Sequence, residues 1–476
     1  MCRFHAASRL LSLATLLVLA GCGSTELREE ATPALPESFS QSGEERTAER
    51  WWQGLADPRL DELVDTALDN NLSLSAARSR LHQAEAVARR GGADLFPSVN
   101  AEGSVKQERR DDNPATDVYG VGVAASYEVD LWGRVRSERD AAVHDAEASR
   151  GDLRAAAITL TARVARTWYN RVEARAQLDL LDRQLTSARE VMALVEKRFR
   201  TGHAPAADRH RQRREIERLA GERAQARARL ETLDHELALL LGRSATDFEA
   251  PTGELPELPP LPATGLPGEL VLRRPDLRAG YLRLQAADAR AAAAVANRFP
   301  RLDLSASLTG QAASASELVA TWITNLSAGL VMPIIDGGSR RAEADRARAA
   351  TDEATMEYAE SVLEAVGEVE DALARERHQR DYLNHLSAEV TEAERLLENT
   401  RRRYRYGEAD HLAVLDAVNG YHSARRQHLT ARREALEHRI DLHRALAGGW
   451  SGIEQPVQPA ALTENRSAGI ASQPED

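Results

Sequence analysis

Two stretches of this sequence carry the same heptad pattern of apolar residues, one in each half of the chain. The apolar positions, alternately three and four residues apart, are Leu178, Leu181, Leu185, Ala188, Met192, Val195 and Phe199 in the first half. The series repeats in the second half at Leu383, Leu386, Val390, Ala393, Leu397, Thr400 and Tyr404. This spacing is typical of a coiled-coil seam. Because Phe199 and Tyr404 are 205 positions apart and each lies just before a glycine, the pattern predicts a duplicated helical hairpin.

Each predicted hairpin consists of one very long helix and a shorter return helix. The first long helix is expected over residues 135–200 and its return helix over 207–241, with Gly202 and Pro205 in the break. The second long helix is expected over 339–406 and its return helix over 409–447, with Gly407 in the break. At 1.5 Å per residue, each long helix would extend about 100 Å, which exceeds the diameter of a compact domain.

Before each hairpin the apolar period changes from 3.6 to two, which predicts a strand pair at 98–129 and another at 301–333. The apolar positions are Val99, Ala101, Gly103 and Val105, then Tyr119, Val121, Val123, Ala125, Tyr127 and Val129, then Leu302, Leu304, Ala306 and Leu308, then Trp322, Leu326, Ala328, Leu330 and Met332. Strands of this length and alternation match those of outer-membrane barrels, although a soluble sheet with one face on helices fits too. Four strands cannot close a barrel, so in a membrane other copies of the chain would have to complete it.

These patterns divide the chain into two repeats and four flanking or linking segments. The repeats cover residues 51–242 and 275–449, and each contains a helix, a strand pair and a long helical hairpin. Seven prolines between Pro251 and Pro275 predict a linker over 243–274 without regular structure. Residues 22–50 are polar and predict an extended tether, and residues 450–476 lack apolar periodicity and predict a disordered tail.

The N-terminus carries a targeting signal. Arg3 and Arg9 precede a short apolar stretch, and residues 1–21 end before Cys22 in the sequence Leu19-Ala20-Gly21-Cys22. This site resembles a bacterial lipobox, which implies cleavage before Cys22 and acylation of that cysteine. The alternative is an ordinary signal peptide with an incidental cysteine. Because Cys2 lies in the removed segment, the mature chain would have no free thiol pair for a disulfide.

Composition and motifs exclude several function classes. The formal net charge is −12 and no basic patch stands out, so nucleic acid is not an expected partner. The segment Glu408-Ala409-Asp410-His411 is the only Glu-x-x-His in the chain, whereas a di-metal helical bundle needs two. We therefore interpret it as a polar turn, and His203 and His210 likewise lack partners at ligand spacing. Without a phosphate loop or nucleophile motif, we predict no cofactor and no enzymatic activity.

The order of elements and several motifs resemble the TolC family of outer-membrane efflux factors, in its OprM/NodT-like lipoprotein branch. The matching segments are Trp51-Trp52, Asp57-Pro58, Leu63, Phe96-Pro97, Tyr127-Glu128-Val129-Asp130-Leu131-Trp132-Gly133, Arg273-Arg274-Pro275-Asp276-Leu277-Arg278, Phe299-Pro300 and Arg403-Tyr404-Arg405-Tyr406-Gly407. The resemblance implies a mainly α fold with a transmembrane β part, in which a homotrimer shares a twelve-stranded β-barrel and continues it as an α-helical tunnel. It implies a passive efflux duct for drugs, toxic solutes or metals, working with a periplasmic adaptor and an inner-membrane transporter of the RND type.

Within this resemblance, the hairpin tips form the periplasmic aperture. Asp416 is the main aperture candidate, since a threefold axis would turn it into a ring of carboxylates with Tyr404 and Arg405 as possible partners. The alternative for Asp416 is an exposed acid near a helix start, and the alternative for Tyr404 is a packing residue of the seam. Asp208 is a weaker candidate, because the first repeat replaces the apolar tip positions with basic ones. Candidate tip and adaptor-contact residues are Gly202, Gly407, Leu412 and Leu415.

A second hypothesis is a periplasmic adaptor or scaffold lipoprotein that uses coiled-coil hairpins without a pore. It accounts for the hairpins and the lipobox, but it leaves the duplicated amphipathic strand pairs unexplained.

Overall fold

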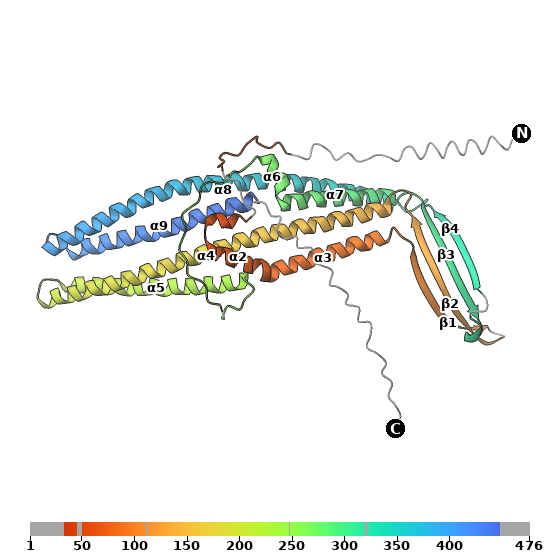
Figure 1. The fold of residues 1–476 in the computed structure, drawn as a ribbon, viewed down its shortest axis with the longest axis horizontal. Helices are drawn as coiled ribbons and strands as arrows, with labels where there is room; N and C mark the ends of the chain where they lie inside the picture. The colour runs from red at the N-terminus through yellow and green to blue at the C-terminus, as the bar shows by residue number, and fades with distance from the viewer. Residues whose placement is uncertain (1–32, 45–49, 111–112, 247, 319–321, 448–476) are drawn as a thin grey trace, which may run out of the picture.

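The computed structural model describes residues 33–44, 50–110, 113–246, 248–318 and 322–447. The predicted signal peptide (1–21), Cys22 and the predicted tail (450–476) lie outside these residues. The described molecule is elongated, with a sheet at one end and two helical hairpins at the other (Figure 1). None of its helices combines the length and apolarity that a membrane crossing requires.

The chain repeats one order of elements. The first half comprises η2 (Trp51–Leu55), α2 (Pro58–Asn70), α3 (Leu72–Ala93), β1 (Ser98–Arg110), β2 (Asn113–Val129), α4 (Arg134–Arg200) and α5 (Ala206–Leu240). The second half comprises α6 (Pro267–Arg273), α7 (Pro275–Ala296), β3 (Arg301–Ala312), η3 (Ala315–Glu317), β4 (Trp322–Val331), α8 (Ser339–Tyr406) and α9 (His411–Ala445). The two long helices, α4 and α8, have 67 and 68 residues.

Two short features differ from the sequence interpretation. The helix predicted before the strand pair of the first repeat is divided into α2 and α3 at Asn71. The side-chain oxygen of Asn71 accepts a hydrogen bond from the Leu74 amide and caps α3. The proline-rich segment predicted to be irregular contains α6. Pro267 occupies the first turn of α6, where a missing amide hydrogen costs nothing, so proline there starts a helix instead of preventing one.

In both repeats, a glycine and an aspartate mark the turn from strand to long helix. Gly133 and Gly338, immediately before α4 and α8, have φ values of +76° and +87°, which a side chain would disfavour. Asp130 accepts hydrogen bonds from the amides of Val135 and Arg136, and Asp336 accepts one from the amide of Arg340. Each carboxylate therefore occupies the positive end of its helix dipole.

The four strands form one antiparallel sheet in the order β1-β2-β3-β4. Its register places apolar residues opposite one another across all four strands, as in the pairs Ala101–Val123, Val123–Leu308 and Ala306–Leu326. The other face is polar and carries serine pairs, with the hydroxyls 2.8 Å apart in Ser98–Ser126 and 2.6 Å apart in Ser305–Ser327. The predicted alternation is thus confirmed. No helix of the described residues covers the apolar face, where Leu326 is 83% exposed (Figure 1).

The helices pack into one body that joins the repeats. A cluster around Trp51, Trp52 and Trp168 lies between α2, α4 and α9, and the Trp168 indole donates to Asp57 at 2.7 Å. In the hairpins, most of the first predicted seam is buried, whereas only Leu386 and Leu397 of the second are buried. The reason is that α4 packs against both α5 and α9.

Candidate channel aperture at the hairpin tips

Both hairpins end in the same backbone turn. The amide of His203 donates to the carbonyl of Arg198 at 2.8 Å, and the amide of Glu408 donates to the carbonyl of Arg403 at 2.9 Å. Gly202 and Gly407 lie within these turns at φ values of +76° and +77°. A hydrogen bond that spans five residues and encloses a left-handed residue is the Schellman helix ending, so glycine is required at both tips.

An arginine covers the aromatic residue at each tip. The Arg209 guanidinium lies 4.7 Å from the centre of the Phe199 ring within the first hairpin. The Arg198 guanidinium lies 4.4 Å from the centre of the Tyr404 ring, and this contact joins α4 to the second hairpin. Tyr404 is half-buried and its ring lies 6.2 Å from that of His411. Tyr404 therefore packs between the hairpins, which agrees with its position in the predicted seam.

The structure does not bring the predicted aperture residues together within one chain. The exposed side chains of Asp416 and Arg405 make no hydrogen bond or ion pair with any residue that the structure describes. Asp208 differs, because its carboxylate accepts a hydrogen bond from Arg211 at 2.9 Å and is 14% exposed. Asp208 is thus occupied by its own helix, whereas Asp416 remains available to another chain.

The two candidate contact leucines have different surroundings. Leu412 is 42% exposed on α9, but Leu415 is 7% exposed and lies in the contact with α4 and α5. Leu415 therefore contributes to the packing of the hairpins, and its side chain is not presented to a partner as the sequence interpretation expected.

A cavity lies between the two hairpins, close to their tips. It lies between α4, α5 and α9, and its lining includes Gln184, Gln212, Glu215, His411, Leu415 and His422. Gln212 donates to the carbonyl of Ala188 at 2.8 Å, which ties α5 to α4 beside the cavity. Both His411 and Gln212 are almost completely buried.

The return helix predicted over 409–447 includes His411, and His411 is the first residue of α9. The interpretation of Glu408–His411 as a polar turn did not anticipate that His411 is only 3% exposed, so the cavity was overlooked. A helical signal was present, since His411, Val414, Val418 and His422 recur at intervals of three and four residues and so share one face of α9. In the described part of the chain, no cluster of three or more His, Cys, Asp or Glu side chains is arranged to hold a metal ion.

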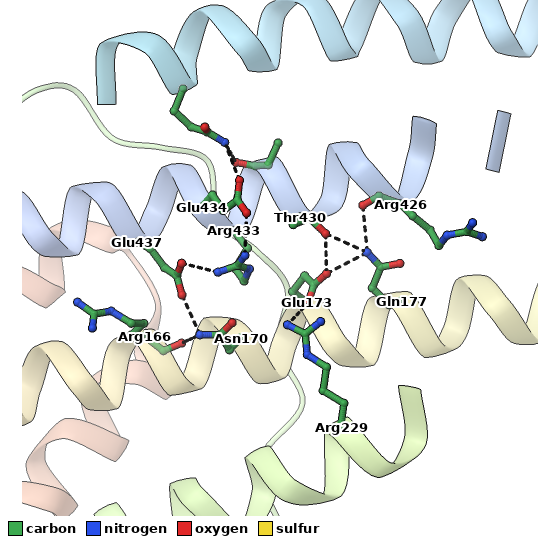
Figure 2. A network of polar contacts seen from close by, with 12 residues as sticks. Arg166, Asn170, Glu173, Gln177, Arg229, Arg426, Thr430, Arg433, Glu434 and Glu437 are labelled. Carbon is green, nitrogen blue, oxygen red and sulfur yellow. Dashed lines mark hydrogen bonds and ion pairs between the residues drawn. The ribbon is translucent and has the colours of Figure 1, made fainter. Parts of the chain in front are cut away.

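A polar network continues the contact between the hairpins away from the tips. Glu173 of α4 is 1% exposed and accepts hydrogen bonds from Gln177 at 2.9 Å and from Thr430 of α9 at 3.0 Å. Its second oxygen lies 3.3 Å from the Arg229 guanidinium of α5, so one carboxylate joins three helices (Figure 2). Further along, Asn170 of α4 donates to Glu437 of α9 at 2.8 Å.

The α4–α9 contact therefore contains buried polar groups beside apolar ones. Buried polar groups stabilise a contact only in the geometry that satisfies their hydrogen bonds. This seam differs from the apolar cluster of Leu181, Leu185, Ala188 and Leu219 between α4 and α5 within the first hairpin. The polar network thus adds hydrogen bonds and ion pairs to the apolar contacts that join the two hairpins.

Comparison with known proteins assigns this architecture. A family model described as outer membrane efflux protein matches residues 63–243 and 266–448. The pyoverdine export outer membrane protein OpmQ of Pseudomonas aeruginosa is 31% identical over 470 residues, covering 93% of this chain and 97% of OpmQ. OprJ of the same species is 32% identical over 461 residues, covering 92% of this chain and 95% of OprJ.

Solved structures agree with this assignment. The open state of the MtrE outer membrane channel of Neisseria gonorrhoeae matches with a TM-score of 0.80 and 28% identity, covering 88% of this chain and 97% of MtrE. The TolC-family resemblance is thus confirmed, and the architecture is that of an outer-membrane channel component for efflux. Since the family model spans most of the chain in two matched halves, this protein belongs to the outer membrane efflux protein family.

Proposed function

We propose that this protein is the outer-membrane duct of a tripartite efflux system, assembled as a homotrimer. The main evidence for this proposal is the four-stranded sheet. Its outer strands, β1 and β4, each pair on one side only among the described strands, and its apolar face is exposed. Unpaired backbone groups in lipid cost several kcal/mol each, so β4 of one chain is expected to pair with β1 of the next until a twelve-stranded barrel closes.

In this arrangement the apolar face of the sheet contacts lipid and the serine-rich face lines the pore. The hairpins then extend from the barrel into the periplasm, since α4 and α8 are each about 100 Å long. Their tips would dock to a periplasmic adaptor, and an inner-membrane transporter, of the RND type, would supply the energy. Leu412 and the turns at Gly202 and Gly407 are the proposed contact points, since all three are exposed.

We further propose that the lipid on Cys22 anchors the mature chain to the outer membrane. Cys22→Ser would test this proposal, because serine cannot form the thioether. The variant is expected to incorporate no radiolabelled palmitate, whereas Cys2→Ser, in the same targeting segment, should be labelled like the wild type. Labelling of Cys22→Ser would contradict the proposed anchor.

The proposed duct is tested by the native mass of the full-length protein extracted in mild detergent, followed by conductance in a planar bilayer. A trimer that conducts supports the shared barrel. A stable monomer at micromolar concentration would contradict it, because four strands cannot close alone, and would favour the scaffold hypothesis.

A further inference from the structure

Two histidines of α9 lie on the cavity between the hairpins. His411 and His422 are about three helical turns apart, so both side chains face α4 and α5. Neither ring nitrogen of His411 has a hydrogen-bond partner among the described residues, and Nδ1 of His422 also has none. Buried polar groups without partners are rare in folded proteins.

The opposite wall of the cavity presents neutral polar groups. Gln184 and Gln212 each use one end of the side-chain amide, since Gln184 accepts from Arg426 at 3.1 Å and Gln212 donates to Ala188. The other end of each amide, Nε2 of Gln184 and Oε1 of Gln212, has no partner among the described residues. The wall thus contains no free carboxylate that would stabilise a charged histidine.

The charged groups around His411 are already engaged. Arg198 faces it from α4, where it covers Tyr404 of α8. Asp208 and Arg211 face it from α5 and bind each other. Asp410, on its own element, accepts a hydrogen bond from the amide of Ala413 and caps α9. Burial lowers the pKa of His411 because these carboxylates do not outweigh the loss of solvent.

Arginines dominate the surroundings of His422. Arg401 faces it from α8, and Arg425 and Arg426 face it from α9. Among the described charged groups that shift the pKa of His422, the carboxylate is Glu215 of α5, which is paired with Arg218 at 2.5 Å. From α4, four uncharged residues line the same cavity, namely Gln184, Ser187, Ala188 and Val191. Burial, followed by the positive charge of the arginines, lowers the pKa of His422 to about 4.

We propose that this cavity is a proton-sensing contact, in which neutral His411 and His422 allow α9 to pack on α4 and α5, and their protonation separates the hairpins and widens the tips. The widening of an aperture rests on the proposed channel function, but the separation of the helices does not. A proton on either ring would add a positive charge to a buried contact that has arginines and no free carboxylate.

The direction of the pH dependence follows from proton binding. Once separated, a histidine regains its ordinary pKa of 6.5, so the separated state binds more protons than the packed state. The packed state is therefore favoured above pH 6.5 and becomes less favoured as the pH falls toward 4. For His422 alone, lowering the pH from 7.5 to 5.0 shifts the equilibrium about 30-fold toward separation.

Hydrogen exchange of the full-length protein in detergent tests this proposal at pH 7.5 and 5.0. With rates corrected for intrinsic exchange, protection of the amides at 411–422 is expected to fall about 30-fold at pH 5.0. The double variant His411→Gln, His422→Gln should keep its protection at both pH values. The double variant His203→Gln, His210→Gln alters exposed histidines of the first tip and should respond like the wild type.

Should the glutamine variant be too unstable, the double variant His411→Phe, His422→Phe supplies rings that cannot be protonated. Unchanged protection of the wild type at pH 5.0, or equal loss in a variant without these histidines, would overturn the proposal. Conductance in a planar bilayer separates the two proposals. Loss of protection without conductance at any pH supports the proton-sensing contact and contradicts the channel, whereas pH-independent conductance with unchanged protection does the reverse.

Discussion

Arg171 and Arg439 bind the segment that links the two repeats, although they are not equivalent residues in those repeats. Arg171 of α4 donates to the carbonyls of Ala250 and Pro251, and Arg439 of α9 donates to those of Pro259 and Pro260. Arg171 pairs with Asp234, and Arg439 pairs with Glu376. The two ion pairs occupy corresponding places, 205 positions apart, with the charges exchanged between long helix and return helix.

The exchange of charges predicts the effect of reversing one pair. Arg439 and Glu376 are 0% and 1% exposed, so Arg439→Asp alone should destabilise the protein by about 3–5 kcal/mol, because it leaves two buried carboxylates together. Adding Glu376→Arg recreates the arrangement of Arg171 and Asp234 and should recover part of this loss. Denaturation midpoints in detergent measure both effects.

The control for this ion pair is Arg375→Asp, which breaks the exposed pair with Asp371 and should cost less than about 1 kcal/mol. If the reversed pair were no more stable than Arg439→Asp alone, the bonds from Arg439 to the linker carbonyls would be the dominant contribution.

His443 predicts a loss of stability in acid. Its ring is 8% exposed and is stacked on Trp51 at 5.2 Å, and burial lowers its pKa to about 3. Since the unfolded chain has the ordinary value of 6.5, stability is fully present above pH 6.5 and is lost as the pH falls toward 3. The slope is about 1.4 kcal/mol per pH unit from this group.

Denaturation midpoints measured between pH 7.5 and 4.5 check the contribution of His443. His443→Leu should be less stable than the wild type at pH 7.5, because the ring stack is lost, yet its stability should decline less steeply in acid. His210→Leu, at an exposed site, should leave the slope unchanged. Equal slopes in the wild type and His443→Leu would show that other groups set the acid dependence.

The two faces of β4 should respond differently when arginine is introduced, as measured by the amount of protein in the outer membrane. Leu326→Arg places a charge on the apolar face, where lipid contact would cost about 2–4 kcal/mol near the middle of the bilayer. Asn325→Arg, at the adjacent position, places the same charge on the polar face. We expect outer-membrane fractions to contain much less Leu326→Arg than Asn325→Arg. Equal amounts would contradict the assignment of the faces.

Periodic elements were predictable from the sequence because their signals extend over many residues. The apolar spacing located α4 and α8, and the alternation in β1 to β4 established which residues share a face before any register was known. Local chemistry was harder to predict. Helix α6 lies among prolines, and nothing in the linker sequence distinguished Pro267 as a helix start from the prolines before it.

The site was predictable only in part, because its geometry depends on contacts between distant segments. Gly202 and Gly407 were identified correctly as turn positions, since a left-handed turn requires glycine locally. The burial of His411 was not predicted, because it depends on α4 and α5, which precede it by some two hundred residues. Whether Asp416 faces other copies of the chain depends on an assembly that one chain does not contain.

Asp416 predicts the ion selectivity of the assembled channel. Its carboxylate is exposed and unpaired within the described chain, so a threefold axis would place three such charges around the aperture and attract cations. Asp416→Asn removes these charges with little change in shape and should lower the cation-to-anion permeability ratio at least about two-fold. The reversal potential under a KCl gradient measures this ratio.

Glu389→Gln removes an exposed acid of α8 remote from the tip and should leave the ratio unchanged. If both variants kept the wild-type reversal potential, Asp416 would be an ordinary surface acid near the start of α9, where the helix dipole favours a negative charge.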